Sequence, residues 1–489
     1  MLRAKRMSKS KLPATARPEP QASHANPGLP ERATWLILAA LLLFLALVRW
    51  HRLGIPMERD EGEYAYAGQL ILQGTAPYVD AYNMKLPGIY VFYAAIMAVF
   101  GQTIEGVHTG LLLVNLASTG LVFLLGRRLL DNLAGLGAAA VFGVLSLDSS
   151  VTGLFANSEH FVILPMLGGC LLLLAALRRG GWMWFAAAGI CMGAAFATKQ
   201  HAIVFAAFGA FAVAASEFGA ESRDLRRMAQ RLALFGLGAV VPFAALCSWM
   251  LWVGAFDRFW FWTFTYAAQY VSQVSFAQGM EQLGLQLAAM GGTLSGLWLL
   301  SAAGFAASVL DRGLRAKWIW LIAFPVLSFA ATCPGLLFRN HYFLFVLPAA
   351  GLLAGLALST LAQRLSRAKK TNTAALLSGL LGAALLGIAV AGQWKILVSL
   401  PDAGVTRATF GLNPFPDSIA IADYLRQATG PDDRIAVIGS EPQLYFYSNR
   451  RAATGYIYTY ALMEDHPFAR LSNVFSVIRS SRRFSRYPV

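Results

Sequence analysis

The sequence predicts an α-helical polytopic membrane protein with a small α/β domain at its C-terminus. Hydrophobic residues make up 57% of the 489 residues and charged residues only 13%, whereas soluble domains carry roughly 25% charged residues. The apolar residues gather into long runs, and a helix needs about 20 of them to cross a bilayer. A chain of this composition must have most of its length in lipid.

The net charge of +15 reflects membrane topology, and we expect no nucleic-acid partner. Basic residues fall in short clusters between apolar runs, which is the pattern of loops retained in the cytoplasm. These clusters are Arg127-Arg128, Arg178-Arg179, Arg223 to Arg231, Arg312 to Lys317 and Arg364 to Lys370.

About eleven apolar segments are expected to span the membrane within residues 34–396. They follow residues 1–33, a Pro-rich and basic stretch that reads as a disordered cytoplasmic tail. The predicted spans are 34–50, 104–126, 133–149, 160–177, 182–198, 201–217, 232–254, 289–310, 317–335, 341–361 and 373–396.

One further apolar stretch, 86–101, is predicted not to cross. The five basic clusters lie on the N-terminal side of the membrane only if this stretch enters and returns, as a hairpin or a juxtamembrane segment. Its Leu86-Pro87-Gly88 start suits broken helical structure buried against protein. The N-terminus is then cytoplasmic, and the loops 51–103, 150–160 and 255–288 lie outside with the C-terminus.

Residues 397–489 differ in character from the apolar module. Residues 414–429 predict an N-capped amphipathic helix, and residues 434–439 predict a short strand. We expect a small extracytoplasmic domain that leans on the membrane module, because it is too short for a large core of its own.

The first outer loop carries an acidic cluster, Asp60-Glu61-Gly62-Glu63. Residues 61–73 predict a short helix that ends at the Gly74 turn. Asp60 could simply be its N-cap, with Glu63 completing a capping box. That interpretation leaves unexplained why three acids and Lys85 flank the segment that enters the membrane.

A series of motifs resembles one known group of enzymes. The order of the motifs is Asp60-Glu61-Gly62-Glu63-Tyr64-Ala65-Tyr66, Lys85-Leu86-Pro87-Gly88, Gly126-Arg127-Arg128-Leu129, Asn157-Ser158-Glu159 and Arg339-Asn340-His341-Tyr342-Phe343. It resembles glycosyltransferases of the GT-C fold, among them the protein O-mannosyltransferases and lipid A aminoarabinose transferases. The resemblance covers most of residues 50–361, and weakly Gly439-Ser440-Glu441-Pro442.

The resemblance implies an inverting transfer of a sugar from a polyprenyl-phosphate-linked donor to a hydroxyl or phosphate-bearing acceptor, which is a lipid, glycan or protein. Asp60 would be the catalytic carboxylate, with Glu159 as a second catalytic acid where the family often has Asp. The donor phosphate would be bound by Lys85, Arg339, His341 and Tyr342. Glu61, Glu63 and Tyr64 would support them.

Each residue also has a structural interpretation. Lys85 could extend its ammonium to the membrane interface, and Arg339, His341 and Tyr342 could be interfacial anchors. Lys199 and His201, at a predicted outer turn, are additional candidates for phosphate contacts. The aromatic residues from Phe256 to Tyr270 predict an interfacial helix, or a wall for the polyprenyl chain.

No cofactor is expected. The oxygen-rich set Asp60, Glu61, Glu63 and Glu159 with His160 could bind a divalent metal, but the reaction does not require one and none is predicted. His160 is expected to be a satisfied interfacial histidine. The basic residues 479–486 are unusual for an outer segment and could bind anionic lipid headgroups. The expected location is a bacterial inner (plasma) membrane.

Two other functions fit the same composition. A polytopic transporter or lipid flippase has a similar length and number of helices, but such proteins bind substrate near the bilayer midplane, often in repeated broken helices. Here the unusual charges gather on one face, and no internal repeat is visible. A non-catalytic assembly protein is the other alternative, against which Asp60, Lys85 and Arg339 argue.

Overall fold

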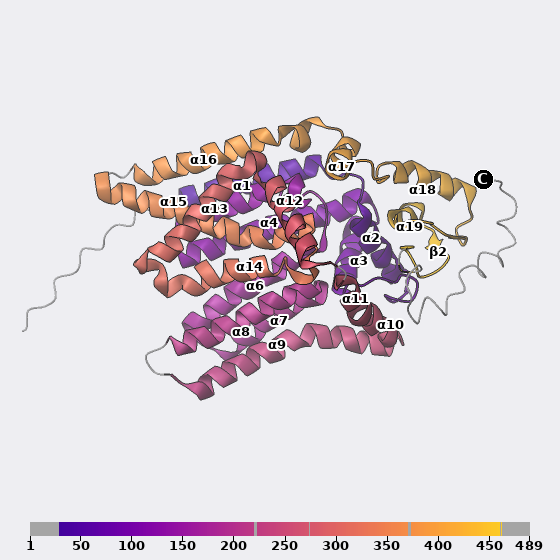
Figure 1. Ribbon diagram of the computed structural model, residues 1–489, viewed down its shortest axis with the longest axis horizontal. Coiled ribbons are helices and arrows are strands. Elements are labelled where there is room, and N and C mark those ends of the chain that lie inside the picture. The colour runs from indigo at the N-terminus through magenta and orange to yellow at the C-terminus, as the bar shows by residue number, and fades with distance from the viewer. Residues whose placement is uncertain (1–28, 220–222, 273, 370–372, 460, 462–489) are drawn as a thin grey trace, which may run out of the picture.

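The computed structural model describes residues 29–219, 223–272, 274–369, 373–459 and 461, most of them in helices (Figure 1). The α-helices are α1 Glu31–His51, α2 Arg59–Leu72, α3 Gly88–Phe100, α4 Ile104–Leu129, α5 Asn132–Leu145, α6 Ser158–Arg179, α7 Trp182–Thr198, α8 Ile203–Phe218, α9 Leu225–Trp252, α10 Phe256–Trp260, α11 Ala267–Val271, α12 Phe276–Gly291, α13 Ser295–Leu310, α14 Phe324–Ala330, α15 Leu347–Lys369, α16 Ala374–Gly392, α17 Asp402–Phe410, α18 Asp417–Ala428 and α19 Gln443–Ser448. Tighter 3-10 or wider π turns occupy η1 Ser149–Val151, η2 Gln200–Ala202, η3 Phe261–Tyr266, η4 Gly292–Leu294, η5 Arg312–Lys317, η6 Ile319–Ala323, η7 Pro334–Leu336, η8 Asn340–Val346 and η9 Lys395–Ser399.

The helical segments match the predicted spans. Among the described residues, eight helical segments are long and apolar enough to cross a membrane, and four apolar helices are shorter. Three of the shorter ones, α5, α7 and the η6–α14 segment, account with the eight for all eleven predicted spans. The fourth is α3. The polytopic helical fold class is confirmed.

The predicted entering segment is a single helix and not a hairpin. Helix α3 has 13 residues, which at 1.5 Å per residue is about 20 Å, well short of a bilayer's hydrocarbon core of about 30 Å. It packs against α2 and lies with it at the end of the bundle that carries α17, α18 and α19 (Figure 1). The chain therefore has a compact first loop on the bundle's end.

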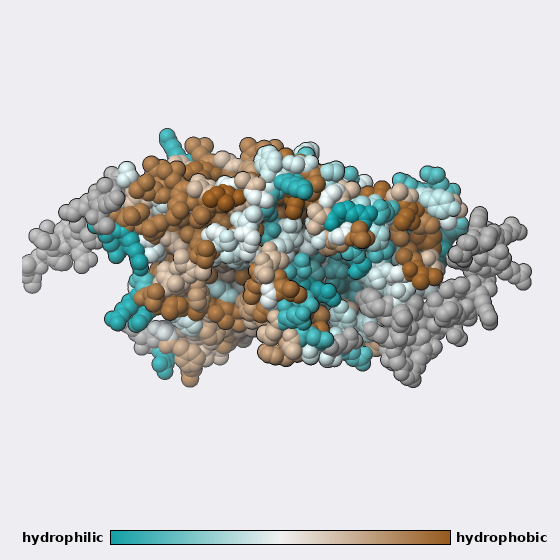
Figure 2. Space-filling model, turned by 45° about the horizontal axis from the view of Figure 1, so that its top comes forward, coloured by the Kyte–Doolittle hydropathy of each residue, from teal (hydrophilic) through white to brown (hydrophobic). Residues whose placement is uncertain are grey.

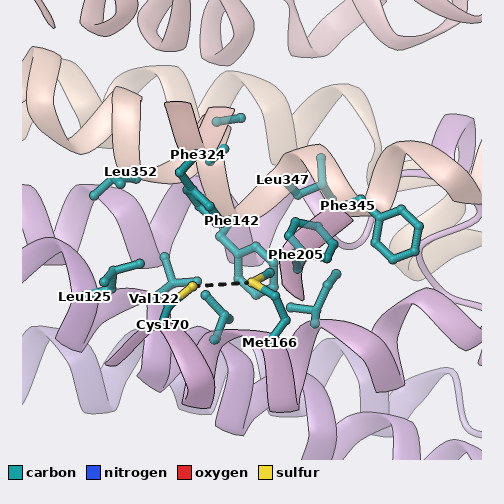
Figure 3. Packing of buried hydrophobic residues seen from close by; sticks show 14 of the residues in the cluster. Val122, Leu125, Phe142, Met166, Cys170, Phe205, Phe324, Phe345, Leu347 and Leu352 are labelled. Carbon is teal, nitrogen blue, oxygen red and sulfur yellow. Dashed lines mark hydrogen bonds between the residues drawn. The ribbon is translucent and has the colours of Figure 1, made fainter. Parts of the chain in front are cut away.

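A continuous apolar core joins the spanning helices. Val122 and Leu125 of α4, Phe142 of α5 and Met166 of α6 meet side chains of α8, α14 and α15 (Figure 3). Cys170 belongs to this core, with its Sγ 3.8 Å from the Met166 sulfur, as expected of a cysteine that packs as an apolar residue. This core holds the helix ends that carry the polar residues.

Hydrophobic and hydrophilic surfaces separate along the length of the molecule. Figure 2 shows hydrophobic residues over the helical bundle and hydrophilic ones near the end that carries α2 and α18. That division is what a bilayer around the bundle requires, because lipid offers no partners for polar groups.

The described part of the C-terminal segment contains α17, α18, α19 and a two-residue parallel strand pair, β1 Arg434–Ile435 with β2 Arg451–Ala452. It packs directly on α2, because Tyr66 lies 5.2 Å from Tyr445 between ring centroids and accepts the Ala452 N–H at 2.8 Å. The extracytoplasmic placement of 397–489 stays a prediction, and the basic stretch 479–486 lies outside the described residues.

Several predicted boundaries differ from the structure. Helix α18 begins at Asp417 without a side-chain cap, and the strand predicted over 434–439 pairs only at Arg434 and Ile435. The predicted span 289–310 is split at η4, and His341 lies in a 3-10 turn that precedes α15. Local sequence patterns predicted that these elements exist, but packing sets the residues at which they begin and end.

Close helix contacts at glycine give a test of the fold. A Cβ on Gly304 of α13 would lie 1.8 Å from the Leu353 carbonyl oxygen of α15, whereas one on Gly387 of α16 meets nothing within 4 Å. Gly304→Ala should cost about 1–3 kcal/mol, because overpacking forces the helices apart. Gly387→Ala should leave stability unchanged or slightly higher. Melting temperatures of both variants in detergent check this, and equal values would contradict the packing.

Candidate active site

The first turn of α2 is fixed by its own acids. The Glu58 carboxylate accepts the Glu61 N–H at 3.2 Å, and the Glu61 carboxylate accepts the Glu58 N–H at 3.0 Å, which is a reciprocal capping box. The predicted box of Asp60 and Glu63 is therefore wrong by two residues. Asp60 sits inside the first turn, and its carboxylate has no capping role.

Asp60 instead forms an ion pair with Lys85. The Lys85 Nζ lies 3.0 Å from Asp60 Oδ2, and each side chain is 20% exposed. The Tyr64 hydroxyl lies 3.5 Å from the same oxygen, and Tyr78 fixes the loop by donating to the Lys85 carbonyl at 2.6 Å. The Tyr64 hydroxyl thus lies beside the Asp60 carboxylate.

The pair is charged on both sides. Burial alone would raise the pKa of Asp60, but the ammonium of Lys85 outweighs burial and holds that pKa well below its usual range. Burial alone would lower the pKa of Lys85, but the carboxylate of Asp60 raises it well above its usual value. Asp60 is therefore available as an ionised acceptor at neutral pH.

A second ion pair joins Lys199 to Glu159. Lys199, which follows α7, donates to the Glu159 carboxylate of α6 and to the Ser158 hydroxyl at 3.2 Å. His341 Nε2 lies 4.0 Å from the same Glu159 oxygen, and Lys199 Nζ lies 4.7 Å from the Tyr342 ring centroid. Glu159 is completely buried and Lys199 nearly so, so the pair positions groups of three separate segments.

Both pairs adjoin one cavity of about 850 Å³. Its lining includes every residue that was predicted to act as base or to bind phosphate, together with both additional candidates: Asp60, Lys85, Arg339, His341, Tyr342, Lys199 and His201. Segments that are far apart in the sequence thus converge here. Arg339 is exposed, has Tyr270 Oη 3.5 Å from its Nη2, and is in none of the ion pairs of the described residues.

Four predicted site residues lie outside the cavity lining, namely Glu61, Glu63, Glu159 and Tyr64, the last of which lies beside Asp60. Glu159 holds Lys199 from below, Glu61 is buried against His108 and the Ala156 backbone N–H, and Glu63 is buried among hydroxyl and amide donors. Glu159 therefore acts on the cavity only through Lys199 and His341. His160 is also buried, and its Nε2 has no hydrogen-bond partner among the described residues.

Apolar residues line another part of the cavity. They come from the aromatic stretch and from the turn before η8: Phe264, Ala267, Val271, Pro334 and Leu337. The aromatic stretch is helical from Phe256 to Val271, as predicted, but its Trp262 and Tyr266 are buried and not at the surface. The cavity thus has both a charged wall and an apolar wall.

The C-terminal segment supplies residues that had no clear signal in the sequence. Phe410, Asn413, Phe415 and Tyr458 line the cavity. Arg59, also in the lining, donates to the Ser440 carbonyl at 2.6 Å and to Glu441 at 3.2 Å. The Gly439-Ser440-Glu441-Pro442 motif was the one available sign of this contact. Within the described residues, no group of three or more His, Cys, Asp or Glu could hold a metal ion.

The buried pair of Glu159 and Lys199 can be tested by its stability. Glu159→Gln should cost about 3–5 kcal/mol, because it leaves the Lys199 ammonium buried without its carboxylate. The double variant Glu159→Leu with Lys199→Met should regain most of that loss, since apolar residues of similar size replace both charges. Thermal unfolding in detergent measures this, and a double variant no more stable than Glu159→Gln would disprove the pairing.

Glu63 gives a test by pH. It accepts hydrogen bonds from Tyr90 at 2.6 Å, Tyr458 at 2.9 Å and Asn83, and burial raises its pKa to about 7. A raised carboxyl pKa contributes stability that is full below its ordinary value near 4.5 and is lost as pH rises through about 7, up to about 3 kcal/mol. Glu63→Gln should flatten the fall in melting temperature between pH 5 and 8. An unchanged slope would contradict the assignment.

A family model and several solved structures are similar to this chain. Residues 85–266 match the model of the dolichyl-phosphate-mannose-protein mannosyltransferase family, a segment that includes Lys85, Glu159 and Lys199. No curated protein matches the chain.

The solved structures agree over much more of the chain. ArnT from Cupriavidus metallidurans, bound to undecaprenyl phosphate, is 18% identical with a TM-score of 0.59, covering 86% of both chains. The oligosaccharyltransferase AglB from Archaeoglobus fulgidus, in complex with an inhibitory peptide and a dolichol-phosphate, is 15% identical with a TM-score of 0.53, covering 90% of this chain and 65% of its own. The resemblance predicted from the motifs is confirmed: this chain is a multi-pass membrane protein with the fold of the GT-C glycosyltransferases.

Proposed function

We propose that the chain is an inverting membrane glycosyltransferase that moves a sugar from a polyprenyl-phosphate-linked donor to a hydroxyl or phosphate-bearing acceptor. The observation that carries the proposal is the ion pair of Asp60 and Lys85 in a cavity that also presents Arg339 and Lys199. An ionised carboxylate beside several cations suits a reaction in which a proton leaves one partner and a phosphate leaves the other.

Asp60 is the proposed general base. As the acceptor hydroxyl attacks the anomeric carbon, its proton becomes acidic, and a carboxylate within hydrogen-bond reach can take it. Asp60 stays ionised because Lys85 lowers its pKa. Attack from the face opposite the departing phosphate in one displacement inverts the anomeric centre.

Lys85 and Arg339 are the proposed ligands of the departing phosphate. A lipid phosphate leaves as an anion and needs no proton donor. The groups suited to assist its departure are cations that donate charge-assisted hydrogen bonds to it. Lys85 lies beside both Asp60 and the cavity, so it can move toward the phosphate and free the carboxylate. Tyr342 and His341, which line the same cavity, are proposed to hydrogen-bond donor oxygens.

The apolar wall is the proposed path of the polyprenyl chain. Phe264, Val271 and Leu337 line the cavity and favour a hydrocarbon over water. The bound undecaprenyl phosphate of ArnT and dolichol-phosphate of AglB support this ligand class. We further propose a bacterial inner membrane with the N-terminus cytoplasmic and the cavity outside, which the side preference of the basic loops supports.

The proposed base can be tested in cells that carry or lack the gene. Mass spectrometry of glycolipids and glycoproteins should reveal a glycan that deletion removes and the wild-type gene restores. Asp60→Asn should reduce transfer at least about 100-fold, because a general base contributes about 10²–10⁴, while the protein still inserts and folds.

Asp80→Asn is the matched control. Asp80 lies on the same loop but is outside the cavity lining, paired with Arg434 and Arg451 at 3.6 and 3.5 Å, so this variant should restore the glycan. Normal transfer by purified, lipid-reconstituted Asp60→Asn would refute the role of Asp60. A deletion that changes no glycan would refute the proposed function.

A further inference from the structure

His108 of α4 is a buried ionisable residue that the proposed chemistry does not use. It is 3% exposed and lies between two hydrogen-bond partners, the Leu53 carbonyl oxygen at 2.8 Å from Nδ1 and the Glu61 Oε1 at 2.9 Å from Nε2. The carbonyl can only accept a hydrogen bond, so Nδ1 must carry a proton.

The state of Glu61 fixes the second proton. Its Oε1 also accepts the Ala156 N–H, and its Oε2 accepts the Glu58 N–H. Each oxygen of this completely buried carboxyl group thus accepts a backbone N–H, so Oε1 also faces the imidazole as an acceptor. The Nε2 of His108 then donates to it, and the two side chains form an imidazolium–carboxylate pair of zero net charge.

This pair connects four segments around the candidate active site. Leu53 follows α1, Glu61 belongs to the first turn of α2, His108 to α4, and Ala156 precedes α6. Asp60 is the neighbour of Glu61, and Glu159, three residues after Ala156, holds Lys199. The Glu61–His108 pair thus links the segment that carries Asp60 to the segment that precedes Glu159.

We infer that His108 is a positioning residue for the proposed transfer reaction. As an imidazolium it fixes the first turn of α2 against the segment before Glu159, and it compensates the carboxylate of Glu61 next to the catalytic Asp60. His108 does not line the cavity, and it is linked to Asp60 through its hydrogen bond to Glu61. The expected effect of His108 on the rate rests on the proposed function. The protonation state of His108 can be measured without any activity.

Other charged groups surround both residues. Across a small cavity of about 10 Å³, His108 faces Arg49 and Arg52, whose guanidinium groups already bond to Ser146 and Asp402 among others; Glu105 is on its own helix. The groups around Asp60 are Lys85, Lys199, His341, Tyr64, Glu58 and Glu63. Among the acids of the site, Asp60, Glu61 and Glu159 each have a basic partner within hydrogen-bond reach.

Histidine ¹⁵N NMR tests the protonation state directly. The full chain has seven histidines, and His108→Gln identifies the signal. At pH 8 this signal should be that of an imidazolium with both nitrogens protonated, and in Glu61→Gln it should become that of a neutral tautomer. A neutral signal in the wild type would overturn the inference. If His108→Gln does not fold, the signal is identified by its change in Glu61→Gln.

Transfer kinetics test the positioning role. With undecaprenyl-phosphate-linked sugar as donor in reconstituted enzyme, His108→Gln should lower kcat about 100-fold, the typical effect of a misplacement of about 1 Å. The KM for the donor should change less than about threefold, since the phosphate ligands remain. A loss of stability alone would lower the active fraction and leave both kcat per folded molecule and KM unchanged.

A double variant and a control complete the experiment. Glu61→Gln with His108→Gln restores a neutral pair of amides, so its kcat should exceed that of either single variant about tenfold, which measures their coupling. His51→Gln, on an exposed histidine at the end of α1, should retain kcat within about twofold. A His108→Gln enzyme as active as His51→Gln, or a double variant with additive losses, would overturn the positioning role. A deletion of the gene that changes no glycan would instead refute the proposed function.

Discussion

The charge balance at the start of α2 is the constraint on which the rest of the site depends. Four carboxyl groups, Glu58, Asp60, Glu61 and Glu63, stand within six residues, and like charges at this spacing repel unless each is compensated or neutral. The fold gives each one a different solution. Glu58 caps the helix, Asp60 binds Lys85, Glu61 binds His108, and burial raises the pKa of Glu63 although hydroxyl donors partly offset the rise.

These separate solutions explain why distant segments meet at α2. Three of the four, Asp60, Glu61 and Glu63, have a partner from another part of the chain: the 83–85 loop, α4, or the C-terminal segment. Buried polar groups are costly when they are unpaired, so the loop and the C-terminal segment are held where the partners are available. The cavity is the space left beside the one carboxylate, Asp60, that remains partly exposed.

The sequence was sufficient for the membrane spans and for several residues of the cavity lining, but not for the hydrogen bonds among them. Apolar run length identifies spans because lipid imposes it, and motif order brought Asp60, Lys85, Arg339, His341 and Tyr342 together. The capping residue was misjudged because Asp60 and Glu58 are both good acceptors, and only packing decides which one caps. The roles of His108 and Tyr458 were missed because a lone histidine in an apolar run and a tyrosine near the C-terminus carry no local pattern.

Three of the cations that line the cavity differ in how strongly they are already engaged. Arg339 is exposed and has no carboxylate partner among the described residues, Lys85 is paired with the 20% exposed side chain of Asp60, and Lys199 is buried against Glu159. Under the proposed function, an arriving phosphate would meet Arg339 at the lowest cost, because no existing ion pair has to break. Binding Lys85 as well would weaken its hold on Asp60 and raise the basicity of that carboxylate. The donor would thereby activate the base only when its phosphate is in place, which limits proton abstraction to the complex that can react.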